Sequence, residues 1–422
     1  MNTPCEGRVY IDINAPYLRK IPTAIPIFKD VSAEQPHGQF AKMLSDLLAQ
    51  SIDFSGFFKI LDRESFLENP QDASLMQNTI NFKNWTDVGA ELLIKGGFNY
   101  TGDLLEVELR LFDTFSGRLI IGKRYRGKQE DHRLIIHRFC DEVILNLTGH
   151  QGIFSSQIAF VSTTTGIKEI YIADFDGYNP RRFTQTGKIT LFPAWSSDGR
   201  WLAYTDYRHG KPELFLRHIK EKRGTVVRFE GSTSITPAWA PGQFALAASL
   251  SHEGNPSIYL LSGNGKIMRK LTRHWGIDVA PTWSPDGEEL AFVSNRSGSP
   301  QIYIKKVKDG RAHRLTFKGN YNTAPQWSPR GNFIAYAGFN NGHFDIYLIG
   351  TEGQGPIQLT QDAGSNESPT WSPDGTLIAF SSTREGPSRI YVMNANGTDQ
   401  RRLLVLAGEQ TNPSWSPRLT GE

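Results

Sequence analysis

The residues best suited to chemistry in this chain are a few carboxylates, histidines and glycine-containing turns. In "DFDGYN", Asp174 and Asp176 alternate before Gly177, which is faintly like a calcium loop. The third ligand and the distal glutamate of such a loop are missing, so the segment predicts a hairpin turn. "TQTGKIT", around Gly187 and Lys188, resembles the end of a phosphate loop but lacks the first glycine at the required spacing. We interpret it as a connecting loop.

Histidine and serine give no stronger catalytic signal. His132 and His137 are five residues apart in a predicted helix, which does not place them on one face, so we expect solvated or core-edge side chains. The chain has no G-x-S-x-G nucleophile elbow. Asp198, Asp286 and Asp374 lie in Asp-Gly turns, where backbone geometry explains them. The sequence therefore predicts no enzyme, no cofactor and no metal site.

Composition describes a globular chain without a strong charge signal. Of 422 residues, 38% are hydrophobic, and the net charge is only +3, which argues against nucleic-acid or bilayer binding by bulk charge. No stretch reaches the length of a membrane span. Cys5 and Cys140 alone cannot form a disulfide framework. The start of the sequence shows no signal peptide, which fits a cytoplasmic protein or a secreted one in mature form.

A repeat of 44 residues organises the second part of the chain. Each unit contains a Pro-x-Trp sequence, an apolar run such as "LAF", and an aromatic residue within an apolar triplet. The repeat is marked by six tryptophans, Trp195, Trp239, Trp283, Trp327, Trp371 and Trp415. Each unit reads as four short strands, with a tight turn after the tryptophan strand. Units of this length with four strands predict the blades of a β-propeller.

The ends of the repeat predict how the ring closes. The first "LAF"-type run, at Ile158, has no tryptophan strand before it, and the last tryptophan strand, at Asn412, has no such run after it. We therefore expect the C-terminal strand to complete the first blade of a six-bladed ring, which leaves no open edge. Packing of blade on blade is the expected role of the tryptophans.

Residues 1–150 show no such repeat and predict a separate domain. "GQFAKMLSDLLAQSI" places Phe40, Met43, Leu44, Leu47 and Leu48 on one helical face. Antiparallel strands are expected in 90–127, and a second helix follows that stops at Gly149. The expected fold is a two-domain α/β plus all-β chain: an N-terminal α/β domain at 1–150, then a six-bladed propeller at 151–422.

The loops before the tryptophan strands are the best candidates for binding. They vary in sequence while the strands around them repeat, so packing leaves them free to serve recognition. They also gather a polar and aromatic set suited to a protein partner: Trp275, Asn320, Tyr321, Asn322, Asn366 and Glu367. For any single residue, a merely tolerant loop remains the rival interpretation.

The six "PxWSPDG…LAF…IY…LT" units after an α/β domain resemble the TolB family of the Tol–Pal system. The N-terminal words "RVYIDINAPYLRKIPTAIPIF" and the junction "IYIADFDGYNPRRFT" are similar to that family too. The resemblance covers essentially the whole chain. It implies a non-catalytic, monomeric periplasmic adaptor that supports outer-membrane integrity and envelope constriction at cell division. It also implies a signal peptide that is absent from this sequence.

The resemblance further implies two protein partners. Pal, the peptidoglycan-associated lipoprotein, would bind the propeller loops, and TolA, which is anchored in the inner membrane, would bind the extreme N-terminus. The Pal surface carried over to this sequence comprises Thr233, Ser234, Ile235, Thr236, Ile277, Asp278, Val279 and Ala280. The TolA segment comprises Glu6, Arg8, Val9, Ile11, Asp12 and Asn14, which suit strand addition to a partner sheet.

Two other functions stay open from the residues alone. A propeller hydrolase or lyase would need a small-molecule or peptide site in the central channel, whereas the inner strands carry mostly Pro, Ala, Thr, Trp and Ser. A cytoplasmic scaffold propeller would carry "GH…WD" words, which are absent.

Overall fold

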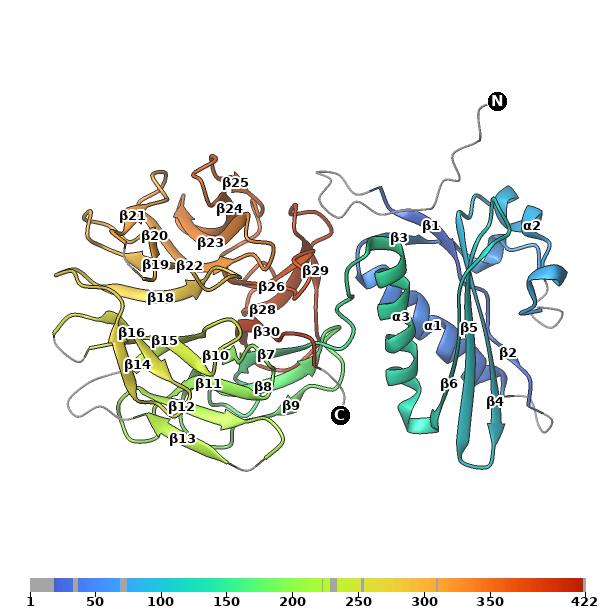
Figure 1. Cartoon of the computed structure of the whole chain (residues 1–422), viewed down its shortest axis with the longest axis horizontal. Coiled ribbons are helices and arrows are strands. Elements are labelled where there is room, and N and C mark those ends of the chain that lie inside the picture. Colours follow the sequence, from blue (N-terminus) through green and yellow to red (C-terminus); the bar gives the residue numbers. More distant parts are fainter. Residues whose placement is uncertain are drawn as a thin grey trace. The chain divides into compact units, whose positions relative to one another are not determined.

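The computed structural model describes residues 19–32, 37–68, 74–221, 223–227, 234–251, 254–308 and 310–419. The chain divides into two compact units, with the boundary between Ser155 and Ser156 (Figure 1). The first unit is an α/β domain and the second is a six-bladed β-propeller, as the sequence predicted.

The N-terminal unit is built on a six-stranded mixed sheet. The strand order is β3-β1-β4-β5-β6, and β2 pairs with β4. β1 runs parallel to β3 and β4, while β4, β5 and β6 form an antiparallel meander. The strands are β1 (Ile21–Ala24), β2 (Lys29–Asp30), β3 (Phe58–Ile60), β4 (Leu92–Thr101), β5 (Leu104–Asp113) and β6 (Leu119–Lys128).

Three α-helices and three short 3₁₀ helices accompany this sheet. They are α1 (Gly38–Phe54), α2 (Phe82–Asp87), α3 (His132–Thr148), η1 (Arg63–Ser65), η2 (Gln77–Thr79) and η3 (Gln129–Asp131). α1 packs on α3, and α3 packs on β5 and β6. α1 buries Leu44, Leu47 and Leu48 as predicted, but Met43 is 39% exposed beside a cavity. α3 ends where Gly149 adopts a left-handed conformation with φ 76°.

The propeller consists of six four-stranded antiparallel sheets. Blade 1 is β30 (Gln410–Trp415), β7 (Gln157–Ser162), β8 (Glu169–Asp174) and β9 (Arg181–Arg182). Blade 2 is β10 (Thr190–Trp195), β11 (Trp201–Asp206), β12 (Glu213–His218) and β13 (Gly224–Val227). Blade 3 is β14 (Ser234–Trp239), β15 (Ala245–Leu250), β16 (Ser257–Ser262) and β17 (Ile267–Lys270).

The other three blades repeat this order. Blade 4 is β18 (Asp278–Trp283), β19 (Glu289–Ser294), β20 (Gln301–Lys306) and β21 (His313–Arg314). Blade 5 is β22 (Tyr321–Trp327), β23 (Phe333–Asn340), β24 (His343–Gly350) and β25 (Ile357–Gln358). Blade 6 is β26 (Asn366–Trp371), β27 (Leu377–Ser382), β28 (Arg389–Asn394) and β29 (Arg401–Arg402).

The tryptophan strands form the inner ring, and the C-terminal strand closes it. Each of these strands contacts the tryptophan strand of the next blade, and β30 contacts both β26 and β10. β30 lies beside β7 (Figure 1). Their pairing places Trp415 opposite Ile158 and Gln410 opposite Ser162. The closure predicted from the ends of the repeat is therefore confirmed.

The tryptophans join neighbouring blades through their indole N–H groups as well as by packing. All six are 7–9% exposed. Four donate Nε1–H to a carbonyl of the preceding blade at 3.0–3.1 Å: Trp195 to Ser414, Trp239 to Ala194, Trp283 to Ala238, and Trp371 to Gln326. Trp415 donates to the Ser156 hydroxyl and Trp327 to the Gly331 carbonyl. The bond from Trp195 crosses the junction where the ring closes.

Every inner strand also carries a bulge at the residue before the Pro-x-Trp proline. These six residues, Phe192, Thr236, Ala280, Ala324, Ser368 and Asn412, have φ of 48–53°. The pairing register shifts at the same place in each blade. A positive φ is uncommon for residues with a side chain, and for Thr236 it is a genuine outlier. The ring therefore stores local backbone strain where the loops before the tryptophan strands enter it.

Candidate protein-binding face

One face of the propeller carries all the loops that precede tryptophan strands. The start of β10 pairs with the end of β11, as Thr190 does with Asp206, and the same pattern recurs in the other blades. Loops from a fourth strand to the next tryptophan strand thus lie on the same side as loops from a second to a third strand. We call this side the loop face; its described loops are 163–168, 183–189, 207–212, 271–277, 295–300, 315–320, 341–342, 359–365, 383–388 and 403–409.

Exposed apolar side chains gather on the loop face. Trp275 and Phe317 are each 73% exposed, and Val405 is 86% exposed. The others there, or on strand ends next to it, are Ile167, Ile189, Ile277, Tyr321 and Phe339. A protein surface with several large apolar groups among polar loops is typical of an interaction site.

The loop before β18 presents Trp275 and Ile277 from a fixed backbone. The Trp275 carbonyl accepts a hydrogen bond from Asn255 Nδ2 at 2.6 Å, and Ile277 N–H donates to Asn295 Oδ1 at 2.7 Å. The His274 ring lies 5.1 Å from the indole of Trp275. These contacts hold the two apolar side chains outward, so little ordering would be needed when a partner binds.

Three residues predicted for binding lie beneath this surface and hold its loops. Asp278 is fully buried and accepts two hydrogen bonds from Arg296, at 2.9 and 3.0 Å. Asn322 donates to Gln301 Oε1 and to the Lys318 carbonyl, both at 2.8 Å. Asn366 is also fully buried, and bonds to Asp345 and to carbonyls of its own loop. They fix the shape of the loops, whereas Trp275, Ile277 and Tyr321 are exposed on the loop face.

Predicted residues closer to the propeller axis are half-buried and linked from blade to blade. Ile235, Thr236, Val279 and Ala280 all belong to this group. The Thr236 hydroxyl accepts a hydrogen bond from Ala280 N–H of the next blade at 3.3 Å. The strained bulges of blades 3 and 4 are therefore directly connected.

Glu367 is a polar residue on the inner ring with an unusual environment. It keeps contact with solvent, yet desolvation by the surrounding protein raises the pKa of its carboxyl above the ordinary value. In this environment the Glu367 carboxyl favours its neutral, protonated form more than a fully solvated glutamate does. Asn320, also predicted, is exposed beside Tyr321.

Sequence reasoning missed a long hairpin in blade 5. β23 and β24 have eight residues each and are joined by the turn Asn341-Gly342, whose φ values are 50° and 88°. Phe339 and Phe344 pair across it, and Phe344 packs edge-on against Tyr321 at 5.7 Å. The Asn-Gly dipeptide between apolar runs is the signal that predicts such a turn. The hairpin extends blade 5 on the loop face.

Some predicted residues cannot be placed. Thr233 and the whole N-terminal set (Glu6, Arg8, Val9, Ile11, Asp12, Asn14) lie outside the described residues. Ser234 begins β14, and its backbone alone is described. Across the described ranges, no three His, Cys, Asp or Glu side chains come together as metal ligands would. No helix in those ranges is long and apolar enough to cross a membrane.

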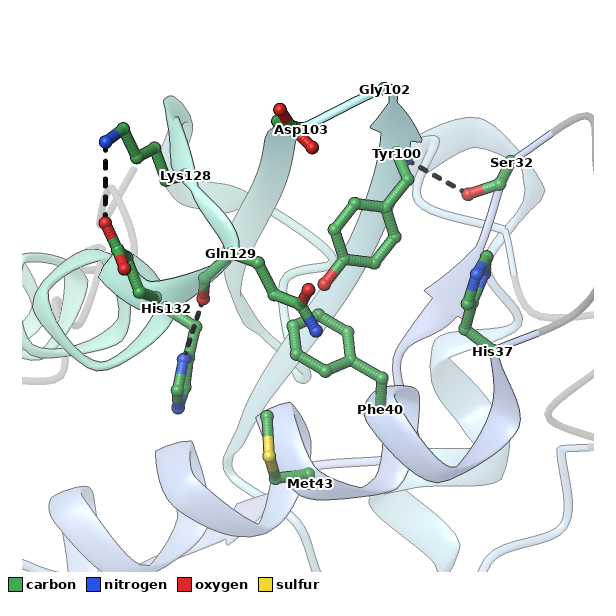
Figure 2. Close-up of a pocket in the computed structure, with 11 residues that line it drawn as sticks. Ser32, His37, Phe40, Met43, Tyr100, Gly102, Asp103, Lys128, Gln129 and His132 are labelled. Atoms are coloured by element: carbon green, nitrogen blue, oxygen red, sulfur yellow. Dashed lines mark hydrogen bonds and ion pairs between the residues drawn. The ribbon is translucent and has the colours of Figure 1, made fainter.

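The N-terminal unit contains a cavity, which the sequence did not predict. A cavity of about 850 Å³ lies between the start of α1, the β4–β5 turn and η3 (Figure 2). The Tyr100 ring lies 5.3 Å from Phe40 and 5.2 Å from His37, and its hydroxyl has no hydrogen-bond partner among the described residues. Burial, with a smaller effect of Asp30, raises the pKa of Tyr100 to about 12. The lining residues come from separate segments, so no local motif marks the cavity.

Known proteins match both units of the chain. The TolB amino-terminal domain family matches residues 9–120, and the TolB beta propeller domain family matches residues 145–419. The Tol-Pal system protein TolB of Desulfosudis oleivorans is 54% identical over 222 residues, which is 53% of this chain and 51% of the relative. That of Syntrophus aciditrophicus is 40% identical over 214 residues, 50% of this chain and 47% of the relative. The chain thus spans about half the length of the curated relatives it matches.

A solved structure agrees with the fold over nearly the whole chain. TolB from Acinetobacter baumannii superposes with a TM-score of 0.81 and 24% sequence identity, covering 97% of this chain and 100% of that one. At this identity the likeness concerns the fold. Taken with the matches to both domain families, it shows that the chain belongs to the TolB family.

Proposed function

We propose that this chain is a non-catalytic periplasmic adaptor of the Tol–Pal system, which binds Pal through the loop face and TolA through its N-terminal segment. The name of these relatives, Tol-Pal system protein TolB, supports a place in that system. In this role the protein supports outer-membrane integrity and envelope constriction at cell division.

The observation that carries the binding proposal is the set of apolar side chains on the loop face. Interface energy concentrates in a few aromatic or large apolar anchors surrounded by weaker contacts. Trp275 and Ile277 fit that description because they are exposed on a loop whose backbone is held by Asn255 and Asn295. Buried Asp278, Asn322 and Asn366 keep the neighbouring loops in place.

The test is the affinity for purified Pal, measured by calorimetry on the full chain. Trp275→Ala with Ile277→Ala should weaken binding at least tenfold, because losing a hot-spot side chain costs about 2 kcal/mol or more. The matched control is Met268→Ala with Ile357→Ala, which removes exposed apolar groups from the outer strands β17 and β25. Equal affinity of both double variants and the unaltered protein would contradict the proposal for this loop.

The N-terminal part of the proposal has its own measurement. Deleting residues 1–14 should abolish binding to purified TolA, because the segment that would add a strand to the partner is then absent. TolA binding that survives this deletion would place the contact elsewhere on the chain.

A further inference from the structure

A basic cavity lies at the outer side of the junction between blades 3 and 4. Its volume is about 550 Å³. Its walls are residues 269–273, which include the end of β17, and described residues at the end of β20 and after it, namely Lys305, Val307, Lys308, Gly310, Arg311 and Ala312, with Arg296 at one side. The cavity adjoins the loop face through 271–273 and Arg296, but Trp275 and Ile277, the anchors proposed for Pal, do not line it.

The lining is strongly cationic and contains no described carboxylate. Six basic side chains come from the two walls: Arg269, Lys270, Arg273, Lys305, Lys308 and Arg311. Arg296 is also basic, but it is paired with buried Asp278. Over the described ranges, Arg273, Lys308 and Arg311 make no ion pair. The whole chain has 46 Lys and Arg against 43 Asp and Glu, so a patch of one sign is a local feature.

Two of these cations also fix the cavity by joining its walls. Arg269 donates from Nη2 to the Val307 carbonyl at 3.1 Å, and Lys305 donates from Nζ to the Leu271 carbonyl at 2.8 Å. Lys270 lies over the Tyr259 ring, with its Nζ 5.4 Å from the ring centroid. The cavity is therefore a built feature of the junction, held by hydrogen bonds in both directions.

The repeat supplies an internal control for the role of these side chains. One repeat later, the six positions carry His313, Arg314, Phe317, Ile349, Glu352 and Gly355, and only Arg314 among them is Lys or Arg. Blades 4 and 5 still pack as their neighbours do. Because the blade fold forms without these cations, packing does not explain why they gather at one junction.

Electrostatics then indicates what the cavity binds. Like charges brought together repel, and an anion that enters relieves this repulsion. Arginine forks and lysine ammonium groups both suit phosphate oxygens, and each phosphate offers several acceptors and up to two charges in a small volume. A volume of about 550 Å³ lies within the range of ligand sites and exceeds what one phosphate needs.

We propose that this cavity binds an anion with two linked phosphate groups. Arg273, Lys308 and Arg311 contact the phosphates, while Arg269 and Lys305 hold the walls. The diphosphate belongs either to a soluble molecule or to a lipid headgroup, and the chemistry of the site is the same for both.

The test uses the full chain and inorganic pyrophosphate as the probe, with calorimetry at low ionic strength. Arg273→Gln, Lys308→Gln and Arg311→Gln together should weaken binding at least tenfold. The matched control, Lys59→Gln, Lys188→Gln and Lys211→Gln, removes the same net charge from exposed positions elsewhere and should change affinity less than threefold. Pyrophosphate should also raise the melting temperature of the unaltered protein and of the control, but not that of the cavity variant.

Three results would overturn the proposal. Equal losses in the cavity variant and the control would mean that bulk charge attracts the probe. Polyglutamate that competes as well as pyrophosphate at equal charge would indicate an acidic polypeptide instead. A cavity variant that binds pyrophosphate as tightly as the unaltered protein would place the site elsewhere.

Vesicles distinguish the two sources of phosphate. If the anion is a headgroup, phosphatidylcholine vesicles with cardiolipin should bind the unaltered protein, pyrophosphate should compete, and pure phosphatidylcholine should not bind. Pyrophosphate binding without vesicle binding supports a soluble ligand. Failure of Pal binding would leave these results unaffected, because the Pal measurement substitutes Trp275 and Ile277, which do not line the cavity.

Discussion

At the scale of single residues, two neighbouring tryptophans lie in different environments according to whether they belong to the repeat. Trp283 belongs to the repeat, is 9% exposed and donates to the Ala238 carbonyl of the preceding blade at 3.0 Å. Trp275, only eight residues earlier, lies outside the repeat and is 73% exposed. The same residue type thus serves the ring in one position and the surface in the other.

Trp283→Phe should lower the free energy of unfolding by about 1–3 kcal/mol, because the Ala238 carbonyl loses its donor in a buried place. Trp275→Phe is the matched control and should stay within about 0.5 kcal/mol, as exposed substitutions usually do. Urea denaturation of both variants measures the difference. Equal effects of the two substitutions would mean that the indole bond between blades adds nothing.

Glu367→Gln should raise the melting temperature at pH 7 and leave it unchanged near pH 4. The pKa of this carboxyl is raised in the folded protein by desolvation, so its charged form destabilises the fold. The neutral carboxyl carries no such cost. The stability is therefore fully present below the pKa of Glu367 in the unfolded chain and is lost as the pH rises through its pKa in the folded protein. Thermal melts of both proteins across this range provide the measurement. If Glu367→Gln were less stable than the unaltered protein at pH 7, desolvation of the charged Glu367 carboxylate would not destabilise the fold.

At the scale of elements, the blade 5 hairpin is the clearest departure from the repeat. It adds two residue pairs, Phe339 with Phe344 and Asn340 with His343, beyond Gly338 and Asp345. Asp345 is part of the buried network, since it accepts hydrogen bonds from Thr360 and Asn366. The extension beyond it also contacts the rest of the blade, because Phe339 pairs with Tyr321 of β22 and Phe344 packs against the buried cluster of blades 5 and 6.

Deleting Phe339, Asn340, His343 and Phe344 together should lower the melting temperature by roughly 2–4 °C for each kcal/mol of packing lost with Phe344. The Asn341-Gly342 turn remains and closes on Gly338 and Asp345, which keeps the register of the blade. Under the proposed function, the affinity for Pal should fall at least tenfold, because the loop face loses exposed Phe339 and the Phe344 ring that packs on Tyr321. Calorimetry and thermal melts measure the two effects. A fully stable variant with unchanged affinity would exclude the hairpin from the interface.

Elements with a strong period could be predicted, and those set by three-dimensional context could not. The period of 44 placed the tryptophan strands and the closing strand β30, because each blade must bury the same positions. The left-handed residues before the prolines were not predictable, since a residue before proline is normally extended. There the bulge of the inner strand decides the conformation. Thr236 adopts φ 49° although its branched side chain disfavours it.

The loop face could be predicted as a set of loops, but the exposure of its single residues was not predicted. The segment before Pro281 was predicted to bind because its sequence varies between repeats. That prediction included Trp275 and Asp278 alike. Burial separates them: Asp278 is enclosed with Arg296, whereas Trp275 is open to solvent. The period of 44 carries a signal for this difference. The position of Asp278 recurs as a buried polar residue at Asn322, Asn366 and Gln410, whereas no tryptophan recurs at the position of Trp275. The cavity beside Lys308 is lined by residues of two blades, so no single segment of the sequence could predict it.

At the scale of the whole molecule, stability depends on closing the ring between distant parts of the chain. β30 supplies the inner strand of blade 1, and Ser416 N–H bonds to the Gln157 carbonyl at 2.8 Å. The Ser414 carbonyl accepts the indole N–H of Trp195 in blade 2 at 3.0 Å. The last strand thus contacts its own blade and the neighbour, and its loss would expose an edge of β7.

Truncation after Glu409 should therefore lower the melting temperature of the propeller by at least about 6 °C. Losing one buried tryptophan costs about 3–5 kcal/mol, and each kcal/mol lowers the melting temperature of a large domain by about 2–4 °C. Amides of β7 should lose protection from hydrogen exchange, since their partner strand is gone. Truncation after Leu419 is the control and should behave as the full chain, because it retains β30. If the shorter chain kept both its melting temperature and the protection of β7, the six blades would be stable without closure, and the paired ends of the repeat would need another explanation.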